Sequence, residues 1–369
     1  MSLLNQLIET ESQQRILLEQ LKNSGKRVLL YGAGVYAYVV RSFLAASGIS
    51  VSAVVVDAAY KVDDVFMDLK IVALEQSIAL LKECHVVVGI TSYPEVVERL
   101  RQLEILNVHV VDIPDYLNMP HRFMSRDFVA QNIALFEQAA NSFEDGISAS
   151  TYVASLNTKI NEDLSFIKPH VRQDNLYFPA HEFGRRDDEV FLDIGGYTGD
   201  TVREFHHVSG GKYSKIISLE PSAENFQQLL RTIDSLQLDR VQPIQIGAWD
   251  ERATLRFQSK EMHIDNQITS SGNRQIEVDT VDSILRDQND PITLIKLDIN
   301  GAEFKALSGA VKTIQTDRPR IVTRLHTKED YFRIPLLLKE IAPDIKLYLR
   351  QRSYMSMMVI LYGVFDSEH

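Results

Sequence analysis

The stretch FLDIGGYTGDT, residues 191–201, decides how this chain is interpreted. An apolar run ends in an acid, Asp193, and passes through a glycine-rich turn to a second acid, Asp200. Glycine-rich turns between a strand and a helix allow a nucleotide to lie close to the backbone. A dinucleotide needs the helix N-terminus for its pyrophosphate, and two carboxylates at that position would repel it. The turn therefore favours a nucleotide ligand that carries positive charge and no phosphate.

The segments after this turn alternate between apolar and amphipathic patterns. We expect strands at VFLDI, KIISLE, VQPIQI, TLIKLD and RIVTRL, and helices near 199–207, 222–234, 302–315 and 331–342. Strands separated by helices form a parallel, doubly wound sheet with right-handed crossovers. Two further apolar runs, DIKLYL and MMVILYGV, are joined without room for a helix, so they must pair antiparallel. The sequence thus predicts the Rossmann-like methyltransferase fold, in which an antiparallel C-terminal strand closes a mostly parallel α/β sheet.

S-adenosylmethionine is the cofactor that this pattern favours. It has no phosphate, and its amino group and sulfonium are positive, so acids around the turn suit it. The next expected strand ends at Glu220 in SLEPS, where a carboxylate can accept hydrogen bonds from both ribose hydroxyls.

Residues from about 174 to 364 resemble the FkbM family of S-adenosylmethionine-dependent methyltransferases. The resemblance rests on DEVFLDIGGYTGDT, SLEPSAENF, GAWDERATLRF, VDTVDSIL, IKLDINGAEFKALSGA, the phrase from LHTKEDYF to YLRQRS, and VILYGV, in this order. It implies methyl transfer to an oxygen of a sugar, a polysaccharide or a natural-product scaffold. The chain differs from the usual family pattern at Asn300 and Arg324, on the acceptor side of the site.

The family's cofactor positions carry over residue by residue. Glu220 matches the ribose-binding acid, and Asp298 lies beneath the sulfonium at the end of the fourth strand. The glycine-rich turn and the residues beside the adenine complete the set: Asp193, Gly195, Gly196, Tyr197, Thr198, Gly199 and Asp200 in the turn, and Gly247, Ala248 and Trp249 after the third strand.

Transfer to a hydroxyl requires a base, because the acceptor must lose a proton near the transition state. We expect His326 to fill this role, since it follows the fifth strand and strand C-terminal ends face the ligand crevice. Asp298 and Glu303 are the alternative bases. Lys296 points to the face opposite to its neighbours and is expected to pair with an acid. The spacing of Asp298, Asn300 and Glu303 matches no strong metal signature, so no metal is expected.

The chain before residue 120 contains a second glycine turn. LLYGAGVYAYVV has Gly32, Gly34 and Ala37 in a GxGxxA spacing, and Asp57 ends the next expected strand. With no acid before it, this turn suits a nucleotide-sugar or a dinucleotide; a scaffold without a ligand is the alternative. We predict a smaller Rossmann-like domain at 1–120, a helical connector at 121–185 and the methyltransferase domain at 186–369.

Composition limits the remaining possibilities. The net charge of −11 argues against a non-specific nucleic-acid binder. One cysteine, Cys84, excludes an intrachain disulfide and fits a reducing compartment. No signal peptide and no transmembrane stretch is recognisable, so we expect a cytoplasmic protein. Two other classes stay open, a non-catalytic nucleotide-binding protein and an NAD-dependent sugar-modifying enzyme, as does assembly into a homo-oligomer.

Overall fold

The computed structural model describes residues 2–113, 124–180, 184, 186–258, 267–268, 272 and 274–366. The chain divides into two compact units. The first comprises Met1–Gln131, Val153–Val171 and Ser353–Met358, and the second Asn132–Tyr152, Arg172–Arg352 and Val359–His369. The domain boundaries predicted near residues 120 and 185 involve positions outside the described residues, and they stay predictions.

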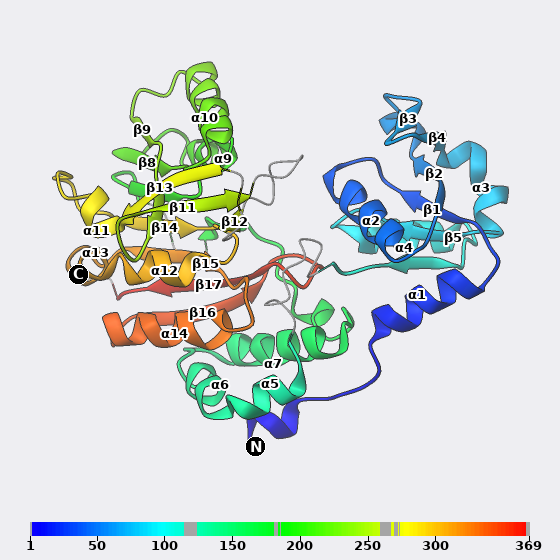
Figure 1. Ribbon diagram of the computed structural model, residues 1–369, viewed down its shortest axis with the longest axis horizontal. Coiled ribbons are helices and arrows are strands. Elements are labelled where there is room, and N and C mark those ends of the chain that lie inside the picture. The colour runs from blue at the N-terminus through cyan, green and yellow to red at the C-terminus, as the bar shows by residue number, and fades with distance from the viewer. Residues whose placement is uncertain are drawn as a thin grey trace. The chain divides into compact units, whose positions relative to one another are not determined.

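A six-stranded sheet forms the centre of the first unit, in the order β3-β4-β2-β1-β5-β6 (Figure 1). All neighbouring strands are parallel except β3 and β4. The strands are β1 Val28–Tyr31, β2 Val51–Val56, β3 Val65–Phe66, β4 Leu69–Ala73, β5 His85–Val88 and β6 Val108–Val110. The parallel pairing of β1, β2, β4, β5 and β6 agrees with the smaller Rossmann-like domain predicted for this part of the chain, and the antiparallel β3–β4 pair was not predicted.

Helices cover both faces of this sheet because successive strand residues point to opposite sides. Leu30 packs in the cluster that contains Val40 and Leu44 of α2, whereas Leu29 packs in the cluster that contains Leu81 of α3 and Leu100 of α4. The helical elements of this unit are η1 Leu3–Gln6, α1 Gln13–Asn23, α2 Val35–Ala46, η2 Ala58–Tyr60, α3 Leu74–Lys82, α4 Tyr93–Gln102, α5 Arg126–Gln131 and η4 Lys168–His170. The first unit therefore has the doubly wound α/β architecture that the sequence predicts.

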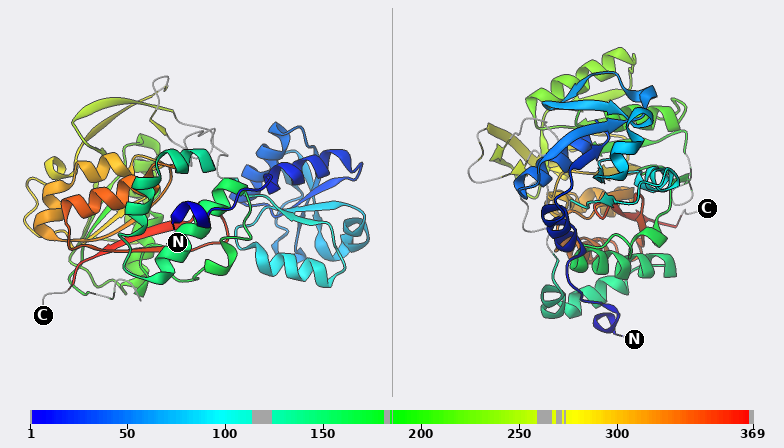
Figure 2. Two further views of the ribbon diagram at one scale, coloured as in Figure 1. Left: turned by 90° about the horizontal axis from the view of Figure 1, so that it is seen from below. Right: turned by 90° about the vertical axis from the view of Figure 1, so that its right-hand side faces the viewer.

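A seven-stranded sheet lies at the centre of the second unit, and its strand order is β16-β17-β15-β14-β7-β8-β9 (Figures 1 and 2). The strands are β7 Val190–Ile194, β8 Lys215–Leu219, β9 Val241–Ile244, β14 Leu294–Leu297, β15 Arg320–Arg324, β16 Lys346–Gln351 and β17 Val359–Val364. Strand β17 runs antiparallel to both β15 and β16, and the other neighbours are parallel. The predicted methyltransferase sheet with its antiparallel C-terminal closure is confirmed.

The helices of this unit follow the expected order, with one correction. They are α6 Ile133–Ala140, α9 Asp200–Val208, α10 Ala223–Ser235, α11 Val281–Ile284, α12 Glu303–Ser308, α13 Val311–Asp317 and α14 Asp330–Ile341, while α7, Gly146–Asn161, belongs to both units. The single helix predicted at 302–315 is wrong, because the chain forms two short helices there that meet at Gly309. Among the described residues, no helix has the length and apolar character needed to cross a membrane.

A second, four-stranded sheet was not predicted. Its order is β10-β13-β11-β12, with β10 Gly247–Trp249, β11 Ala253–Gln258, β12 Gln267–Ile268 and β13 Arg274–Thr280. It packs closely on the α12–α13 junction, since a Cβ atom on Gly309 would lie 2.0 Å from the carbonyl oxygen of Trp249. The break in the helix is thus the place where this sheet contacts the main fold.

We expect Gly309→Ala to lower the free energy of unfolding by about 2–3 kcal/mol, because the added methyl group overlaps the Trp249 backbone and forces a shift. Gly146→Ala is the matched control, since no atom lies within 4 Å of its added Cβ. Urea unfolding of the full chain measures both effects. Equal stability of the two variants would contradict the close contact of β10 with the α12–α13 junction.

Candidate functional site

The glycine turn after β7 is the centre of the candidate site, and its glycines are required by close contacts. Gly195 and Gly199 have φ angles of 89° and 84°, which residues with side chains rarely adopt. A Cβ on Gly195 would lie 2.6 Å from the backbone oxygen of Asp298, and one on Gly196 would lie 2.2 Å from Oγ of Ser218. The turn is therefore pressed against the ends of both neighbouring strands, β8 and β14.

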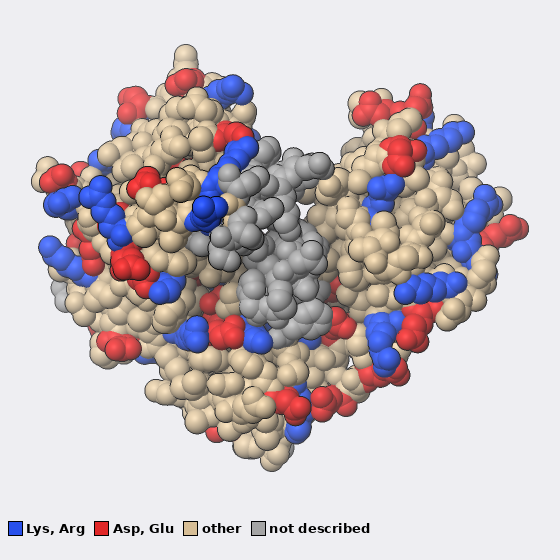
Figure 3. All heavy atoms as spheres, in the orientation of Figure 1, with Lys and Arg blue, Asp and Glu red and all other residues tan. Residues whose placement is uncertain are grey.

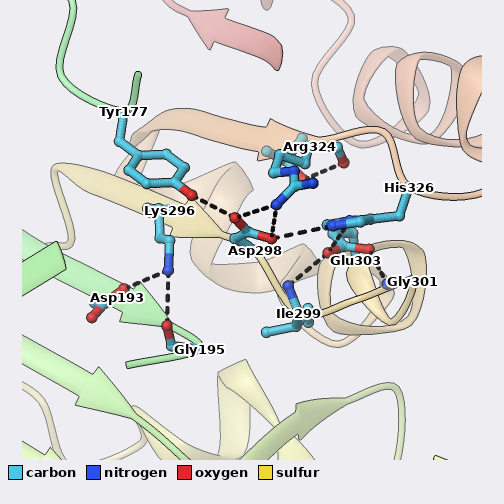
Figure 4. A network of polar contacts seen from close by, with 11 residues as sticks. Tyr177, Asp193, Gly195, Lys296, Asp298, Ile299, Gly301, Glu303, Arg324 and His326 are labelled. Atoms are coloured by element: carbon cyan, nitrogen blue, oxygen red, sulfur yellow. Dashed lines mark hydrogen bonds and ion pairs between the residues drawn. The ribbon is translucent and has the colours of Figure 1, made fainter. Parts of the chain in front are cut away.

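A buried ion pair lies directly beneath this turn (Figure 4). Nζ of Lys296 is 3.1 Å from Oδ1 of Asp193 and donates to the backbone oxygen of Gly195 at 2.8 Å. Ser218 donates to the other Asp193 oxygen at 2.9 Å. Burial alone disfavours the Lys296 ammonium, but the carboxylates of Asp193, Asp298 and Asp200 outweigh it and raise its pKa. The expected pairing of Lys296 with an acid is present, and the Asp193 carboxylate points into the protein.

Glu220 follows β8 and joins the turn to the next loop. Its Oε2 accepts from the Tyr197 amide at 2.9 Å, and its Oε1 accepts from the Ser222 amide at 2.8 Å. Burial raises the pKa of Glu220 to about 7, against the lowering effect of these amides. A carboxylate oxygen can accept more than one hydrogen bond, so both oxygens of Glu220 can still accept a hydrogen bond from a ligand.

The remaining predicted cofactor residues surround the same strand ends. Gly199 precedes α9, which begins at Asp200, and the backbone oxygen of Thr198 accepts from Thr232 at 2.7 Å. The predicted adenine segment Gly247–Trp249 is strand β10, and a Cβ on Gly247 would lie 3.5 Å from Cβ of Pro221, the residue after Glu220. The structure therefore brings the glycine turn, Glu220 and β10 to one edge of the sheet.

Asp298 follows β14 and is the most heavily contacted acid of this edge. Tyr177 donates its hydroxyl hydrogen to Oδ2, and NH1 of Arg324 lies 3.1 and 3.0 Å from the two carboxylate oxygens. Nε2 of His326 lies 3.2 Å from Oδ1. Burial would raise the pKa of Asp298, but Arg324, His326 and Lys296 outweigh it and hold that pKa well below its usual value. Asp298 is a stable anion.

Glu303 holds the other side of the His326 ring. Nδ1 of His326 is 2.8 Å from Oε1 of Glu303, whose two oxygens accept from the amides of Ile299 and Gly301 at 2.7 and 2.9 Å. Burial disfavours the Glu303 charge, yet His326 and the Ile299 amide lower its pKa. Both ring nitrogens of His326 are buried, and neither carboxylate contact has the alignment of a hydrogen bond. The predicted trio of Asp298, Glu303 and His326 is thus assembled in one place.

Comparison with known proteins gives this geometry a family. Residues 193–355 match the model of the methyltransferase FkbM domain. This stretch, which contains the glycine turn, Glu220 and the Asp298 cluster, is therefore similar to the methyltransferase FkbM domain.

Solved structures extend the comparison beyond this domain. Methyltransferase FkbM from Methylobacillus flagellatus KT is similar over 94% of this chain and 92% of its own, with a TM-score of 0.65 and 19% identity, which shows a shared fold. Aeropyrum pernix fibrillarin, in complex with natively bound S-adenosyl-L-methionine, aligns over 48% of this chain and 68% of its own with a TM-score of 0.33 and 12% identity. A putative rRNA-methylase from Clostridium thermocellum aligns over 55% of this chain and 94% of its own, with a TM-score of 0.32 and 12% identity. No curated protein sequence matches the chain.

Three residues of the candidate site were not assigned a role from the sequence. Arg324 was noted only as a departure from the family pattern, and Tyr177, 121 positions before Asp298, was not noted at all. Asp330 is buried beside this cluster and exchanges hydrogen bonds with Thr327, and burial together with Glu303 raises its pKa to about 7. The TxxD spacing of Thr327 and Asp330 could be recognised in the sequence, but the position of Asp330 beside Glu303 could not.

The trio also has the composition of a cation site. Asp298, Glu303 and His326 each offer one ligand atom, and these atoms lie within 4.8 Å of one another. However, Asp298 already contacts the Arg324 guanidinium, and Glu303 accepts from two amides. The cluster is therefore supplied with positive charge and donors by the protein itself, and the expectation of no metal stays a prediction.

The candidate nucleotide residues of the first unit also lie around a glycine turn. Gly32 has a φ angle of 112°, and Gly34 precedes α2 with no atom within 4 Å of an added Cβ. Asp57, however, already accepts from Tyr31 at 2.7 Å and lies 2.8 Å from NH1 of Arg99. A ribose hydroxyl would have to share or replace these partners, and the ligand of this unit stays a prediction.

Charge on the molecular surface is mixed where it is visible. On the face shown in Figure 3, acidic and basic side chains alternate over the described residues, without a continuous basic area. This agrees with the net charge of −11, and the expectation that the chain is not a non-specific nucleic-acid binder stays a prediction.

We expect Glu220→Gln to stabilise the protein in a pH-dependent way. With a pKa of about 7 in the fold, Glu220 is neutral at low pH, and its ionisation costs folding free energy as the pH rises. Relative to wild type, the variant should gain about 2 kcal/mol in unfolding free energy between pH 5.5 and pH 8.5. Urea unfolding at both pH values measures this, with the exposed Glu340→Gln as control. Parallel profiles of Glu220→Gln and wild type would contradict the buried, charge-disfavouring environment.

Proposed function

We propose that this protein is an S-adenosylmethionine-dependent O-methyltransferase that acts on a hydroxyl of a sugar, a polysaccharide precursor or a natural product. The observation that carries the proposal is the concentration of acids at the carboxyl edge of the second unit's sheet, where Asp200, Glu220 and Asp298 surround the glycine turn. Such an edge repels phosphate and attracts a sulfonium and an ammonium. The FkbM domain match is consistent with this cofactor.

Each predicted residue then has a physical task. Glu220 accepts hydrogen bonds from the ribose hydroxyls, with β10 beside the adenine. Asp298, which Arg324 keeps ionised, lies near the sulfonium and is too weak a base to deprotonate the acceptor. Methyl transfer is an in-line displacement, so most of the rate enhancement comes from holding the acceptor oxygen behind the methyl group.

His326 is the residue that we propose as general base. Its Nδ1 faces Glu303 at 2.8 Å, so the carboxylate can orient the ring and stabilise the imidazolium that forms. Its Nε2 faces the side on which Asp298 lies, at the end of the strands. The acceptor hydroxyl would approach this nitrogen.

The first unit is proposed to bind the acceptor. Its glycine turn precedes a 12-residue helix, α2, without an acid in the first turn, so the N-terminus of that helix suits a phosphate. We propose a nucleotide-sugar as the form in which the acceptor sugar is presented. The protein is proposed to act in the cytoplasm, and a homo-oligomer is compatible with the chain.

Calorimetric titration with S-adenosylhomocysteine at pH 8.5 tests the cofactor. We expect micromolar binding to the wild-type protein and at least tenfold weaker binding to Glu220→Gln, because the ribose loses a charged hydrogen-bond acceptor. Glu340→Gln should bind like wild type. Absence of binding to folded, ligand-free wild-type protein would refute S-adenosylmethionine dependence.

Transfer of a labelled methyl group from S-adenosylmethionine to a panel of free sugars and nucleotide-sugars tests the reaction. With the acceptor found in this way, His326→Asn should lower kcat by about 10²–10⁴-fold, because the general base is removed. Its affinity for S-adenosylhomocysteine should stay within about threefold of wild type. An unchanged kcat would exclude His326 as the base, and labelling of free sugars alone would remove the nucleotide-sugar from the proposal.

A further inference from the structure

The Asp298 carboxylate is held by donors from separate parts of the second unit (Figure 4). Tyr177 comes from the segment before β7, Arg324 ends β15, and His326 follows that strand. The Tyr177 hydroxyl donates to Oδ2, and the Arg324 guanidinium lies 3.0 Å from the same oxygen and 3.1 Å from Oδ1. The side chain of Asp298 is only 14% exposed. Its direction and its charge are therefore both set by these neighbours.

The two donors differ in what they contribute. Burial, with the Asp298 charge, raises the pKa of Tyr177 well above its usual value, so Tyr177 is a neutral phenol that donates its proton and adds no charge. Arg324 is a permanent cation. A largely buried carboxylate without such partners takes up a proton more easily than one in water. The pair of donors keeps an anion where burial alone would favour a neutral acid.

Asp298 also lies against the turn that is predicted to hold the cofactor. A Cβ on Gly195 would lie 2.6 Å from the Asp298 backbone oxygen, and Nζ of Lys296 lies 5.3 Å from the centre of the Tyr177 ring while it donates to Gly195. The fixed anion and the cofactor turn are thus adjacent parts of one structure.

We propose that Tyr177 and Arg324 are positioning residues that maintain Asp298 as an anion toward the sulfonium, so that the site distinguishes the cationic methyl donor from its neutral product. This inference rests on the proposed function. Methyl transfer converts the sulfonium of S-adenosylmethionine into the thioether of S-adenosylhomocysteine, and the positive charge leaves the sulfur. Attraction between Asp298 and the ligand is then lost at the moment when the product must leave.

The ratio of the dissociation constants of S-adenosylhomocysteine and S-adenosylmethionine isolates this interaction, because the two ligands differ only in the methylated sulfur. Glu220 contacts the ribose in our proposal, and it is present in wild type and in both variants. Its titration therefore contributes to the ratio in all three proteins, and the variants are compared with wild type. The other charged or titratable groups around Asp298 are the same in wild type and in the variants: Lys296, Asp193, Asp200, Glu303, His326 and Asp330.

The experiment is calorimetric titration of the full-length protein with each ligand at pH 8 and at pH 5.5, for wild type, Tyr177→Phe and Arg324→Gln. The wild-type change in the ratio between the two pH values includes the titration of Glu220 and Asp330 and is the reference. In Arg324→Gln the ratio should fall on acidification by about tenfold or more beyond the wild-type change, because Asp298 becomes protonated. Tyr177→Phe should show a smaller fall in the same direction. A merely structural role would weaken both ligands equally and leave the pH dependence of the ratio unchanged.

Matched controls are available in the same unit. Tyr213→Phe removes a tyrosine hydroxyl that contacts His206 at 3.3 Å, and Arg318→Gln removes a guanidinium that pairs with Asp344 before the opposite end of β15. Both should keep the wild-type ratio at both pH values. Circular dichroism and thermal melts test whether each variant is folded. If Tyr177→Phe is unstable, the result for Arg324→Gln alone tests the proposal.

The failures of the two proposals are distinguishable. Wild-type protein that binds neither ligand would refute the proposed cofactor and this inference with it. Wild-type protein that binds both ligands, with an Arg324→Gln ratio that follows wild type at both pH values, would overturn the positioning role and leave the cofactor assignment standing.

Discussion

The buried ion pair of Asp193 and Lys296 is the interaction on which the rest of the site depends. It connects the end of β7 to β14, and the same ammonium group holds the backbone oxygen of Gly195 at 2.8 Å. Both side chains are almost fully buried, so the cost of removing either partner is large, typically about 3–5 kcal/mol. The pair fixes the glycine turn relative to Asp298, which follows the strand that carries Lys296.

Three of the acids at this sheet edge lie beside basic side chains. Lys296 faces Asp193, Arg324 faces Asp298, and His326 lies between Asp298 and Glu303. Arranging each carboxylate beside a cation allows a concentration of acids in a largely buried place, where isolated charges would take up protons. Burial raises the pKa of Glu220 and of Asp330 to about 7. Burial also raises the pKa of Asp193, against the lowering effect of Lys296 and Ser218.

The local features of the site could be predicted from the sequence, whereas its contacts could not. Neighbouring residues in the sequence determine the glycine turn, the acids at strand ends and the alternation of strands and helices. The fold predicted from these patterns is confirmed. The four-stranded sheet was missed because β11 and β13 pair antiparallel with each other, outside the parallel sheet whose alternation of strands and helices was used for the prediction. Tyr177 was missed because only the folded chain brings it to Asp298, and the break at Gly309 because only its contact with Trp249 requires it.

The two glycine turns of this chain show that the motif alone does not determine the ligand. Gly34 precedes α2 without an acid in the first helical turn, and the space in front of it is open. Gly199 precedes α9, whose first residue is Asp200, and its turn packs on a buried carboxylate–ammonium pair. The backbone amides of the first helix are left to attract an anion, while at the second an acid already occupies the start of the helix. The charge beside each turn, more than the glycines themselves, is therefore the difference on which the proposals of a phosphate at the first turn and a sulfonium at the second are based.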